Sequence, residues 1–265
     1  MKEFFLESRG IYYRKNEFAH DRNTLVFVHG VSASSSAWIK YEERFQLEYN
    51  ILSFDLRGHG KSLKYKKYED YQLQNFAIDI VELLKELDVN NIILISHSFG
   101  TLVALEFLAE HQNMTQKAIF LSPVLDEKKI LGIFLKPILK IVTLLNKIYF
   151  SQKPAHHVNY SMYSHSKEWS PSRLFADVKN TGLRVYLFCI GQMCTFDREK
   201  LLENVNVPSL IIHGKNDTYS SVDNAVYMVS KISNSELIIL ENADHIIVLN
   251  NFDEVSGIIE KFINK

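Results

Sequence analysis

The sequence predicts an α/β fold, in which a mostly parallel central sheet has helices on both faces and a helical lid is inserted between core strands. Six apolar runs of strand length are continuous or nearly so, which is typical of strands buried on both faces. Segments with helical spacing alternate with these runs, as expected for parallel strands joined by right-handed crossovers. The interval from Ser122 to about Asn204 breaks the alternation, because it has helical and aromatic segments but no convincing buried strand.

Two short β-like runs come first in the chain. Residues 4–7 and 11–14 flank Ser8, Arg9 and Gly10, and this pattern predicts an opening hairpin. The apolar runs follow at residues 25–28, 51–54, 92–95, 118–121, 209–212 and 237–240. The clearest helical spacings are Phe76, Ile80, Leu83, Leu84 and Leu87, then Leu102, Leu105 and Leu108, and finally Val255, Ile258, Ile259 and Phe262. Strands and helices are therefore expected in regular succession before and after the interval.

The interval between the fourth and fifth apolar runs is predicted to form the lid. We expect residues 1–122 and 205–265 to form the core and residues 123–204 to form a helical lid, or cap, over the sheet. Within the lid a polar stripe of helical spacing borders a broad apolar surface. Its members are Lys136, Lys140, Thr143 and Lys147. This helix is expected to pack on the core with its lysines in water, and weak contact with a lipid surface is the alternative interpretation.

Charge and composition exclude several classes of protein. Thirty Lys and Arg against 31 Asp and Glu give a net charge of −1, so no overall field attracts nucleic acid. Cys189 and Cys194 are expected on different faces of one helix, and no disulfide framework is predicted. Lysines and a proline interrupt the apolar stretch 130–150, which predicts no membrane span. The N-terminus has no apolar run typical of a signal peptide, so we expect a cytoplasmic protein.

A nucleophile motif lies where one apolar run meets a helix. Segment 92–102 runs from a buried strand through small residues directly into a helical pattern. A serine on such a tight turn holds its hydroxyl above the sheet edge, and small residues two positions before and after it relieve the crowding. Ser96 and Gly100 occupy these positions around Ser98, although glycine is commoner than serine at the first. Both serines also suit a simple turn and helix cap, so the chemistry depends on partners for Ser98.

Candidate partners follow two later strands. A nucleophilic serine needs a histidine that removes its proton and a carboxylate that orients the histidine, and in this kind of fold they follow in the order Ser, Asp, His. Asp217 lies in the loop after the fifth apolar run, and His245 lies in the loop after the sixth. Chemistry gathers at this carboxyl edge of a parallel sheet. Alternatives to Asp217 as the acid are Asp126, which the order also permits, and, more weakly, Asp223 and Asp244.

Five motifs in this order resemble the α/β-hydrolase superfamily, in particular its serine-nucleophile, lid-bearing branch of esterase- or lipase-like proteins. They are Val28-His29-Gly30-Val31, the segment from Asp55 to Ser62, the Ser98 turn, the segment from His213 to Asp217, and Asp244-His245. The match covers about residues 24–121 and 207–265, while the lid between them is not diagnostic. The resemblance implies the predicted fold, an acyl-serine mechanism and no cofactor.

The resemblance also implies roles for residues outside the triad. The oxyanion hole would consist of the backbone N–H groups of Val31 and Phe99, which would stabilise the oxygen of a tetrahedral intermediate. His29 and His59 lie in glycine-bearing turns and are expected to be structural. Serine rather than aspartate at position 98 argues against dehalogenase and epoxide-hydrolase activity.

Ester cleavage is the predicted function, because it asks least of the site beyond the triad and the oxyanion hole. The apolar surface of the lid predicts small to medium apolar acyl or aromatic substrates. Alternatives with the same triad are thioester or amide cleavage, C–C bond hydrolysis, and acyl transfer to an alcohol or a peroxide. A non-catalytic relative that binds a small ligand is a further alternative. The expected partner is a small-molecule ester.

Aromatic residues of the lid are candidates to line the substrate pocket, although they could equally pack the lid. They are Tyr160, Tyr163, Trp169 and Phe188. Three lid histidines, His156, His157 and His165, could suggest a metal. No cysteine or carboxylate accompanies them at ligand spacing, so we expect exposed polar side chains and no metal.

Overall fold

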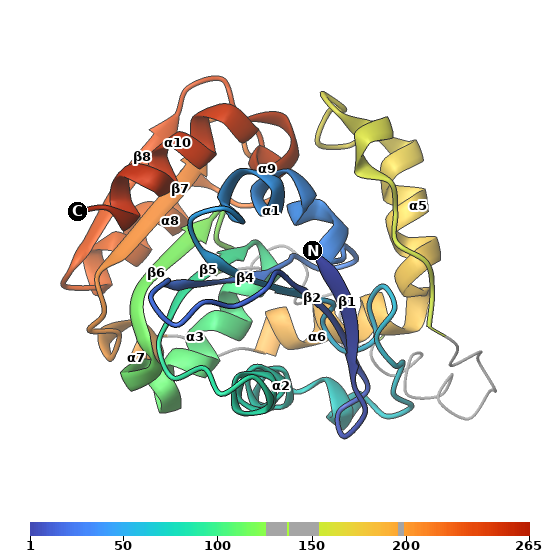
Figure 1. The fold of residues 1–265 in the computed structure, drawn as a ribbon. Helices are drawn as coiled ribbons and strands as arrows, with labels where there is room; N and C mark the ends of the chain where they lie inside the picture. Colours follow the sequence, from blue (N-terminus) through green and yellow to red (C-terminus); the bar gives the residue numbers. More distant parts are fainter. Residues whose placement is uncertain (126–136, 138–153, 196–198) are drawn as a thin grey trace.

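A computed structural model describes residues 1–125, 137, 154–195 and 199–265. In this part of the chain eight strands form one sheet in the order β1-β2-β4-β3-β5-β6-β7-β8 (Figure 1). The strands are β1 (Lys2–Leu6), β2 (Ile11–Lys15), β3 (Thr24–Val28), β4 (Asn50–Phe54), β5 (Ile92–His97), β6 (Thr115–Leu121), β7 (Ser209–Gly214) and β8 (Ser235–Leu240). β1 and β2 form the antiparallel hairpin, β2 is antiparallel to β4, and every other pairing is parallel. The predicted mostly parallel sheet is confirmed.

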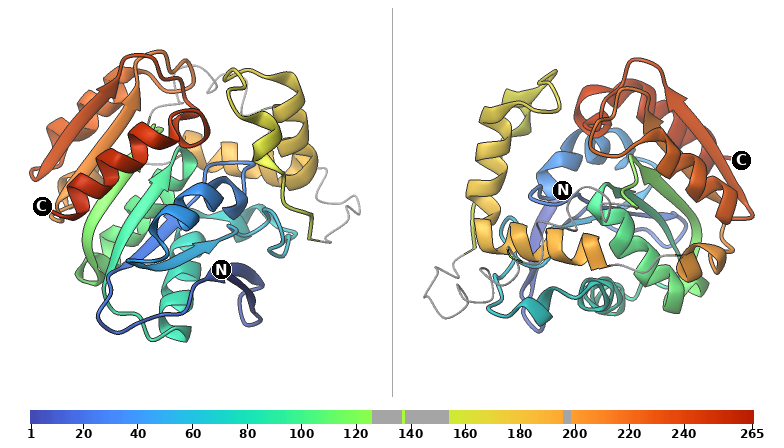
Figure 2. Two further views of the ribbon diagram at one scale, coloured as in Figure 1. Left: turned by 45° about the horizontal axis from the view of Figure 1, so that its top comes forward. Right: turned by 180° about the vertical axis from the view of Figure 1, so that it is seen from behind.

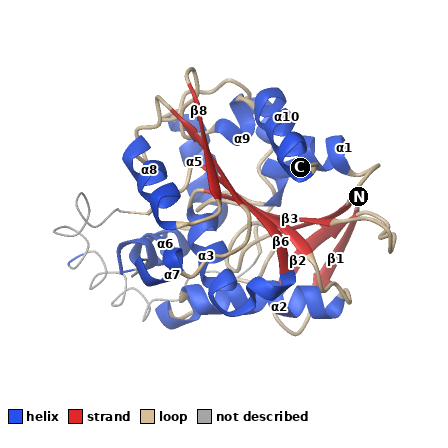
Figure 3. Cartoon of the chain, turned by 90° about the vertical axis from the view of Figure 1, so that its left-hand side faces the viewer, coloured by secondary structure: helices blue, strands red, loops and turns tan. Residues whose placement is uncertain are grey.

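Helices cover both faces of this sheet, as the edge-on view in Figure 3 shows. One face carries α2 (Leu73–Glu86), α3 (Phe99–His111) and α8 (Val222–Lys231). The other carries α1 (Ile39–Phe45), α9 (Ile247–Asn250) and α10 (Phe252–Ile263). Within the described ranges the connections also contain short 3-10 helices, η1 (Ser35–Trp38), η2 (Tyr68–Tyr71), η3 (Gln112–Met114) and η4 (Tyr160–Tyr163).

Two separate cores explain why the apolar runs are nearly continuous. Successive side chains of a strand point to opposite faces of the sheet. Val26 and Val28 therefore join the core under α2 and α3, while Leu25 and Phe27 join the core under α1 and α10. The last run was wrongly predicted to be buried on both faces: β8 is an edge strand, and its Ile239 is 38% exposed, because fewer elements cover a sheet edge.

The segment between β6 and β7 contains helices and, where the structure describes it, no strand. The helices of this segment that lie in the described residues include α5 (Pro171–Thr181), α6 (Leu183–Thr195) and α7 (Glu199–Glu203). Figure 2 shows α5 and α6 meeting at a steep angle. Cys189 and Cys194 are both buried and lie on α6. The division into a core of residues 1–122 and 205–265 and a lid of residues 123–204 remains a prediction.

Part of the predicted lid lies outside the described residues. This holds for the polar stripe of Lys136, Lys140, Thr143 and Lys147 and for the rival acid Asp126. Among the residues that are described, no helix has both the length and the apolar character needed to cross a membrane.

Candidate active site

Ser98 occupies the turn between β5 and α3 in a backbone conformation that side chains rarely adopt. Its φ is 52° and its ψ is −121°; holding a residue other than glycine there costs about 1–3 kcal/mol, and such strain is typical of functional sites. The Ser98 N–H donates to the carbonyl of Leu121 at 3.0 Å, which ties the turn to β6. Ser98 is the N-cap residue of α3, but its side chain makes no cap hydrogen bond. The turn instead presents its hydroxyl to the cavity at the carboxyl edge of the sheet.

The small residues around Ser98 have different environments. Ser96 is fully buried, with its hydroxyl 3.4 Å from the carbonyl oxygen of Ile119. A Cβ atom on Gly100 would lie 2.7 Å from the carbonyl oxygens of both Val28 and His29. Only glycine therefore allows α3 to pack this closely against the end of β3.

Gly100→Ala is expected to lower the free energy of unfolding by about 3 kcal/mol, because two backbone carbonyls would have to move. The matched control is Gly257→Ala in α10, where the added Cβ has nothing within 4 Å and alanine should stabilise the helix by about 0.5–1 kcal/mol. Urea unfolding of both variants measures the difference. Equal unfolding midpoints would contradict this account of the turn.

Asp217, His245 and Ser98 form one continuous chain of hydrogen bonds. His245 Nε2 lies 2.8 Å from Ser98 Oγ, and His245 Nδ1 lies 2.8 Å from Asp217 Oδ2. The loop after β7 carries Asp217 and the loop after β8 carries His245, so the two loops meet over the turn after β5. The structure brings together the three residues that the sequence selected, in the geometry that serine activation requires.

Hydrogen bonds keep the Asp217 carboxylate ionised. Burial by itself would raise the pKa of Asp217, but the hydrogen bond and charge of His245 and the N–H of Ser220 outweigh it, so the pKa lies below its usual value. The second oxygen, Oδ1, accepts the N–H groups of Tyr219 at 2.9 Å and Ser220 at 2.8 Å. These two bonds fix the carboxylate with Oδ2 toward His245.

The rival aspartates that the structure describes have other positions. Asp244 accepts the N–H of Ile246 at 2.8 Å and that of Glu168 at 3.1 Å. Asp223 is an exposed residue in the first turn of α8. Of the described aspartates, only Asp217 is hydrogen-bonded to His245.

The two predicted oxyanion donors lie beside Ser98. Phe99 is the first residue of α3, so its N–H has no acceptor within the helix. A Cβ on Gly30 would lie 3.1 Å from Ser98 Cβ, which shows how closely the segment before Val31 passes the serine. Val31 lines the same cavity as Ser98. The role of these N–H groups remains a prediction, since it concerns a reaction intermediate.

Several histidines lie near this centre without belonging to the hydrogen-bonded chain: His29, His59 and His213 are buried, and His97 is partly buried. His29 Nδ1–H donates to the Gly30 carbonyl at 2.7 Å, and its Nε2 accepts the N–H of Leu56 at 2.9 Å. His59 is buried against it, with ring centroids 5.2 Å apart. His97, which the sequence analysis missed although it adjoins Ser98, donates from Nε2 to the carbonyl of His245 at 2.9 Å.

Acid is expected to destabilise the fold from about pH 6.5 downward. Burial lowers the pKa of His29 from 6.5 to about 4, and those of His59 and His97 to about 3. Their folded state binds fewer protons than the unfolded chain below pH 6.5, so stability is complete above that value and falls with pH. Asp177 acts in the opposite direction. Burial raises its pKa to about 6, so between about pH 6 and pH 4 the folded state binds one proton that the unfolded chain does not.

Burial also lowers the pKa of His213. Four such histidines less the opposing Asp177 leave at most about three net protons, so the free energy of unfolding should fall by at most roughly 4 kcal/mol per pH unit near pH 5. Urea midpoints measured at pH 7.5, 6.5 and 5.5 test this slope. Replacing the exposed His20 with alanine is the control, and it should leave the slope unchanged. A midpoint independent of pH over this range would refute the assignment of these histidines as buried neutral groups.

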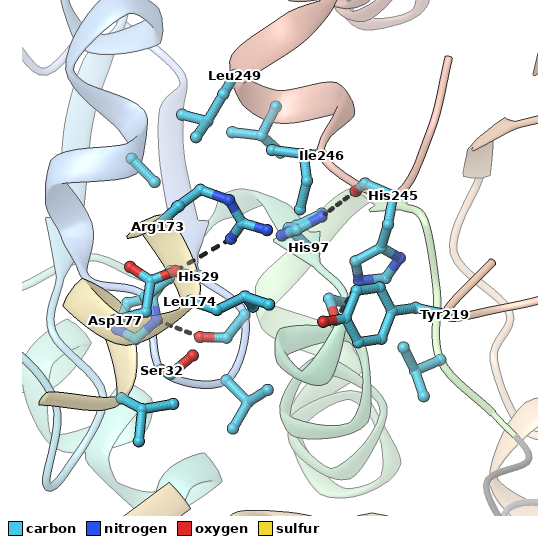
Figure 4. A pocket seen from close by; sticks show the side chains of 18 of the residues that line it. His29, Ser32, His97, Arg173, Leu174, Asp177, Tyr219, His245, Ile246 and Leu249 are labelled. Atoms are coloured by element: carbon cyan, nitrogen blue, oxygen red, sulfur yellow. Dashed lines mark hydrogen bonds and ion pairs between the residues drawn. The ribbon is translucent and has the colours of Figure 1, made fainter. Parts of the chain in front are cut away.

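Ser98 and His245 open onto a cavity of about 430 Å³ (Figure 4). Most of its lining is apolar, including Val124, Leu174, Val178, Ile190, Ile246 and Leu249. Of the four lid aromatics proposed for the pocket, Tyr160 and Trp169 line it. Tyr163 and Phe188 do not; Phe188 is fully buried against Tyr68 and Tyr71, because α6 turns this side chain toward the core.

The chain before α5 touches both loops that carry the site. The Glu168 carboxylate accepts the Thr218 hydroxyl at 2.7 Å, and the indole N–H of Trp169 donates to the same hydroxyl at 2.7 Å. Trp169 also stacks on Tyr219 with ring centroids 4.1 Å apart. The sequence analysis missed Glu168, because only the folded chain brings residues 168 and 218 together.

The described residues contain no group of three or more His, Cys, Asp or Glu side chains arranged to hold a metal ion. The sequence predicted an exposed side chain for His157, but this residue is partly buried. Its Nε2 lies 2.7 Å from the buried Asp55 Oδ2, so it ties the segment before α5 to the turn after β4.

A family model described as the alpha/beta hydrolase fold matches residues 23–252. A curated protein of Acinetobacter baylyi, named (E)-2-((N-methylformamido)methylene)succinate hydrolase, is 21% identical over 267 residues, with 97% of this chain and 98% of the relative covered. A hydrolase from Pseudomonas aeruginosa PA01 superposes with a TM-score of 0.78 at 15% identity, covering 100% of this chain and 98% of the other. The enol-lactonase from Burkholderia xenovorans LB400 gives a TM-score of 0.76 at 15% identity, with 100% of both chains covered.

Proposed function

This chain belongs to the α/β-hydrolase fold family, and on that premise we propose that it is a serine hydrolase that cleaves carboxylic esters through a covalent acyl-Ser98 intermediate. The observation that carries the proposal is the chain of two 2.8 Å contacts from Asp217 through His245 to Ser98. Such a chain makes a serine hydroxyl nucleophilic at neutral pH.

The first half of the proposed reaction forms the acyl-enzyme. Ser98 Oγ attacks the carbonyl carbon of the ester while His245 Nε2 takes the hydroxyl proton. The carbonyl oxygen becomes an oxyanion and accepts the N–H groups of Val31 and Phe99. Collapse of this intermediate breaks the bond to the alcohol oxygen, which takes the proton from His245 and leaves as a neutral alcohol.

Hydrolysis of the acyl-enzyme completes the reaction. Water gives one proton to His245 and attacks the acyl carbon. His245 then gives that proton to Ser98 Oγ as the second tetrahedral intermediate collapses and the acid leaves. Asp217 orients the imidazole throughout and stabilises its charged form, while remaining ionised itself. Every step uses groups of this chain and one water molecule.

Small to medium acyl or aromatic groups are the proposed substrates. The largely apolar lining and the volume of about 430 Å³ support this size, since small-molecule sites commonly span about 300–1,000 Å³. A lactone is a cyclic ester, and a solved relative is named an enol-lactonase. That likeness supports ester cleavage, and we propose the segment 123–204 as the cap that encloses the acyl group.

An activity screen over acyl esters, thioesters and amides tests the proposal, with Ser98→Ala as the control. A fluorophosphonate should label the wild-type protein at Ser98 and leave Ser98→Ala unlabelled. Folded protein that reacts with neither probe would be a non-catalytic binding relative, and the proposal would fail. Thioesters or amides cleaved faster than esters, or transfer to an added alcohol or peroxide, would assign another acyl reaction to the same triad.

A series of p-nitrophenyl esters from acetyl to octanoyl tests the apolar pocket. The medium chains should react with the highest kcat/KM. A strong preference for acetyl over octanoyl would count against an apolar acyl site.

A further inference from the structure

A charged pair, Arg173 and Asp177, interrupts the largely apolar lining of the cavity. Arg173, in the first turn of α5, has a side chain only 7% exposed and lines the same cavity as Ser98 and His245. A buried guanidinium is costly unless its charge and its N–H groups find partners. The partners of Arg173 therefore show what this position is suited to bind.

Protein groups use only part of the hydrogen-bonding capacity of Arg173. Its Nη1 donates to Asp177 Oδ2 at 3.0 Å, and its Nη2 donates to the carbonyl of Glu168 at 2.5 Å. Its Nε is buried and has no hydrogen-bond partner among the described residues. A guanidinium has five N–H donors in a fixed plane, so an oxygen ligand with negative charge would complete the set.

Asp177 is an incomplete counter-ion for this guanidinium. Its other oxygen, Oδ1, accepts the hydroxyl of Tyr160 at 2.9 Å, so two donors share one carboxylate. Burial raises the pKa of Asp177 to about 6, although Tyr160 and Arg173 both act to lower it. This carboxylate therefore holds its charge less firmly than an exposed aspartate does.

The charge of Arg173 lies on the side of the cavity that faces the reacting groups. Figure 4 shows its guanidinium between Asp177 and His97, the residue next to Ser98. Burial is the main cause of the low pKa of His97, and the field of Arg173 contributes to it. The same field acts on Tyr219, whose ring centroid lies 5.0 Å from that of His245. An anion bound by Arg173 would thus share the cavity with an ester placed on Ser98.

We propose that Arg173 binds a free carboxylate of the substrate, so that the preferred substrates are half-esters or lactones of dicarboxylic acids. This inference rests on the proposed ester hydrolysis and narrows its substrate class. A planar guanidinium pairs with a carboxylate through two parallel hydrogen bonds, which fix orientation as well as charge. The apolar lining then holds the carbon chain between the carboxylate and the scissile ester.

The competing account gives Arg173 a purely structural role, in which it anchors the start of α5 through Glu168 and Asp177. The two accounts predict different effects on the ratio of kcat/KM for an acidic ester to that for a neutral ester. Loss of a structural anchor lowers the cleavage of acidic and neutral esters alike, whereas loss of a carboxylate contact lowers the cleavage of the acidic ester selectively.

The test compares the ethyl half-esters of succinic, glutaric and adipic acids with the corresponding diethyl esters, by following acid release at constant pH. For at least one chain length the wild-type kcat/KM should be about 10-fold or more higher for the half-ester. In Arg173→Gln the ratio of half-ester to diester should fall by about 10- to 100-fold. Arg173→Lys keeps the charge but loses the planar pair, and should recover part of the ratio.

Lys179→Gln is the matched control, because it removes the same charge from an exposed position of the same helix and should leave the ratio unchanged. If Ser98 reacts with a fluorophosphonate and the diesters are cleaved, but the wild type does not prefer any half-ester, the carboxylate site is overturned and the hydrolase proposal stands. This comparison needs only the wild-type protein, so it decides the question even if Arg173→Gln does not fold.

Calorimetry of Ser98→Ala with the same half-esters separates the two proposals from the other side. The carboxylate site is supported if Ser98→Ala binds the half-esters about 10-fold more tightly than the diesters, and if this difference is lost in the double variant that also carries Arg173→Gln. If the half-esters bind in this way but wild-type Ser98 reacts with neither esters nor the fluorophosphonate, the carboxylate site is supported and the hydrolase proposal fails. Equal binding of both ester types would overturn the site.

Discussion

Replacing His245 with alanine is expected to lower kcat for the best ester substrate by about 10⁴- to 10⁶-fold, because Ser98 would lose the only base within reach of its proton among the described residues. The substitution removes both hydrogen bonds of the triad, so the nucleophile stays protonated. Steady-state hydrolysis and the rate of fluorophosphonate labelling should fall together.

His20→Ala is the control for His245→Ala, since His20 is exposed and should not change kcat. The neighbouring His97 makes a sharper comparison. It lies in the cavity, but its contact is with the backbone of His245 and not with Ser98. An unchanged kcat in His245→Ala would overturn the assignment of His245 as the base.

Asp217→Asn is expected to reduce kcat by about 10⁴-fold while the fold is retained. Oδ1 accepts two backbone N–H groups, so the carbonyl oxygen of an asparagine would keep that position. Its NH₂ group would then face His245 Nδ1, whereas the carboxylate now accepts a hydrogen bond from the N–H at that position. The imidazole would have to carry its proton on Nε2 and donate it to Ser98 instead of accepting one.

Circular dichroism and the urea midpoint should show that Asp217→Asn remains folded, which separates a lost base from a lost fold. Asp223→Asn is the matched control, because Asp223 is exposed on the helix that follows the same loop. If both variants lost the same activity, or if neither did, Asp217 would not be the acid of the triad.

Much of this arrangement followed from the sequence, because it depends on residues close together in the chain. Continuous apolar runs indicate strands covered on both sides, and five of the six runs are buried between the two cores, the edge strand β8 being the exception. Ser98, Asp217 and His245 each lie within a few residues of a strand's carboxyl end. Parallel strands place those ends at one edge, so their convergence could be predicted without knowing any contact.

Only the tertiary structure showed which side chains from the segment between β6 and β7 face the cavity at that edge of the sheet. The direction of a side chain in the lid depends on how its helix packs on segments far away in sequence, and no periodicity specifies this. Phe188 is buried in the core, His157 contacts Asp55, and Arg173 lines the cavity for this reason. Local sequence thus determined the fold and the nucleophile, while packing between distant segments decided which charge faces the substrate.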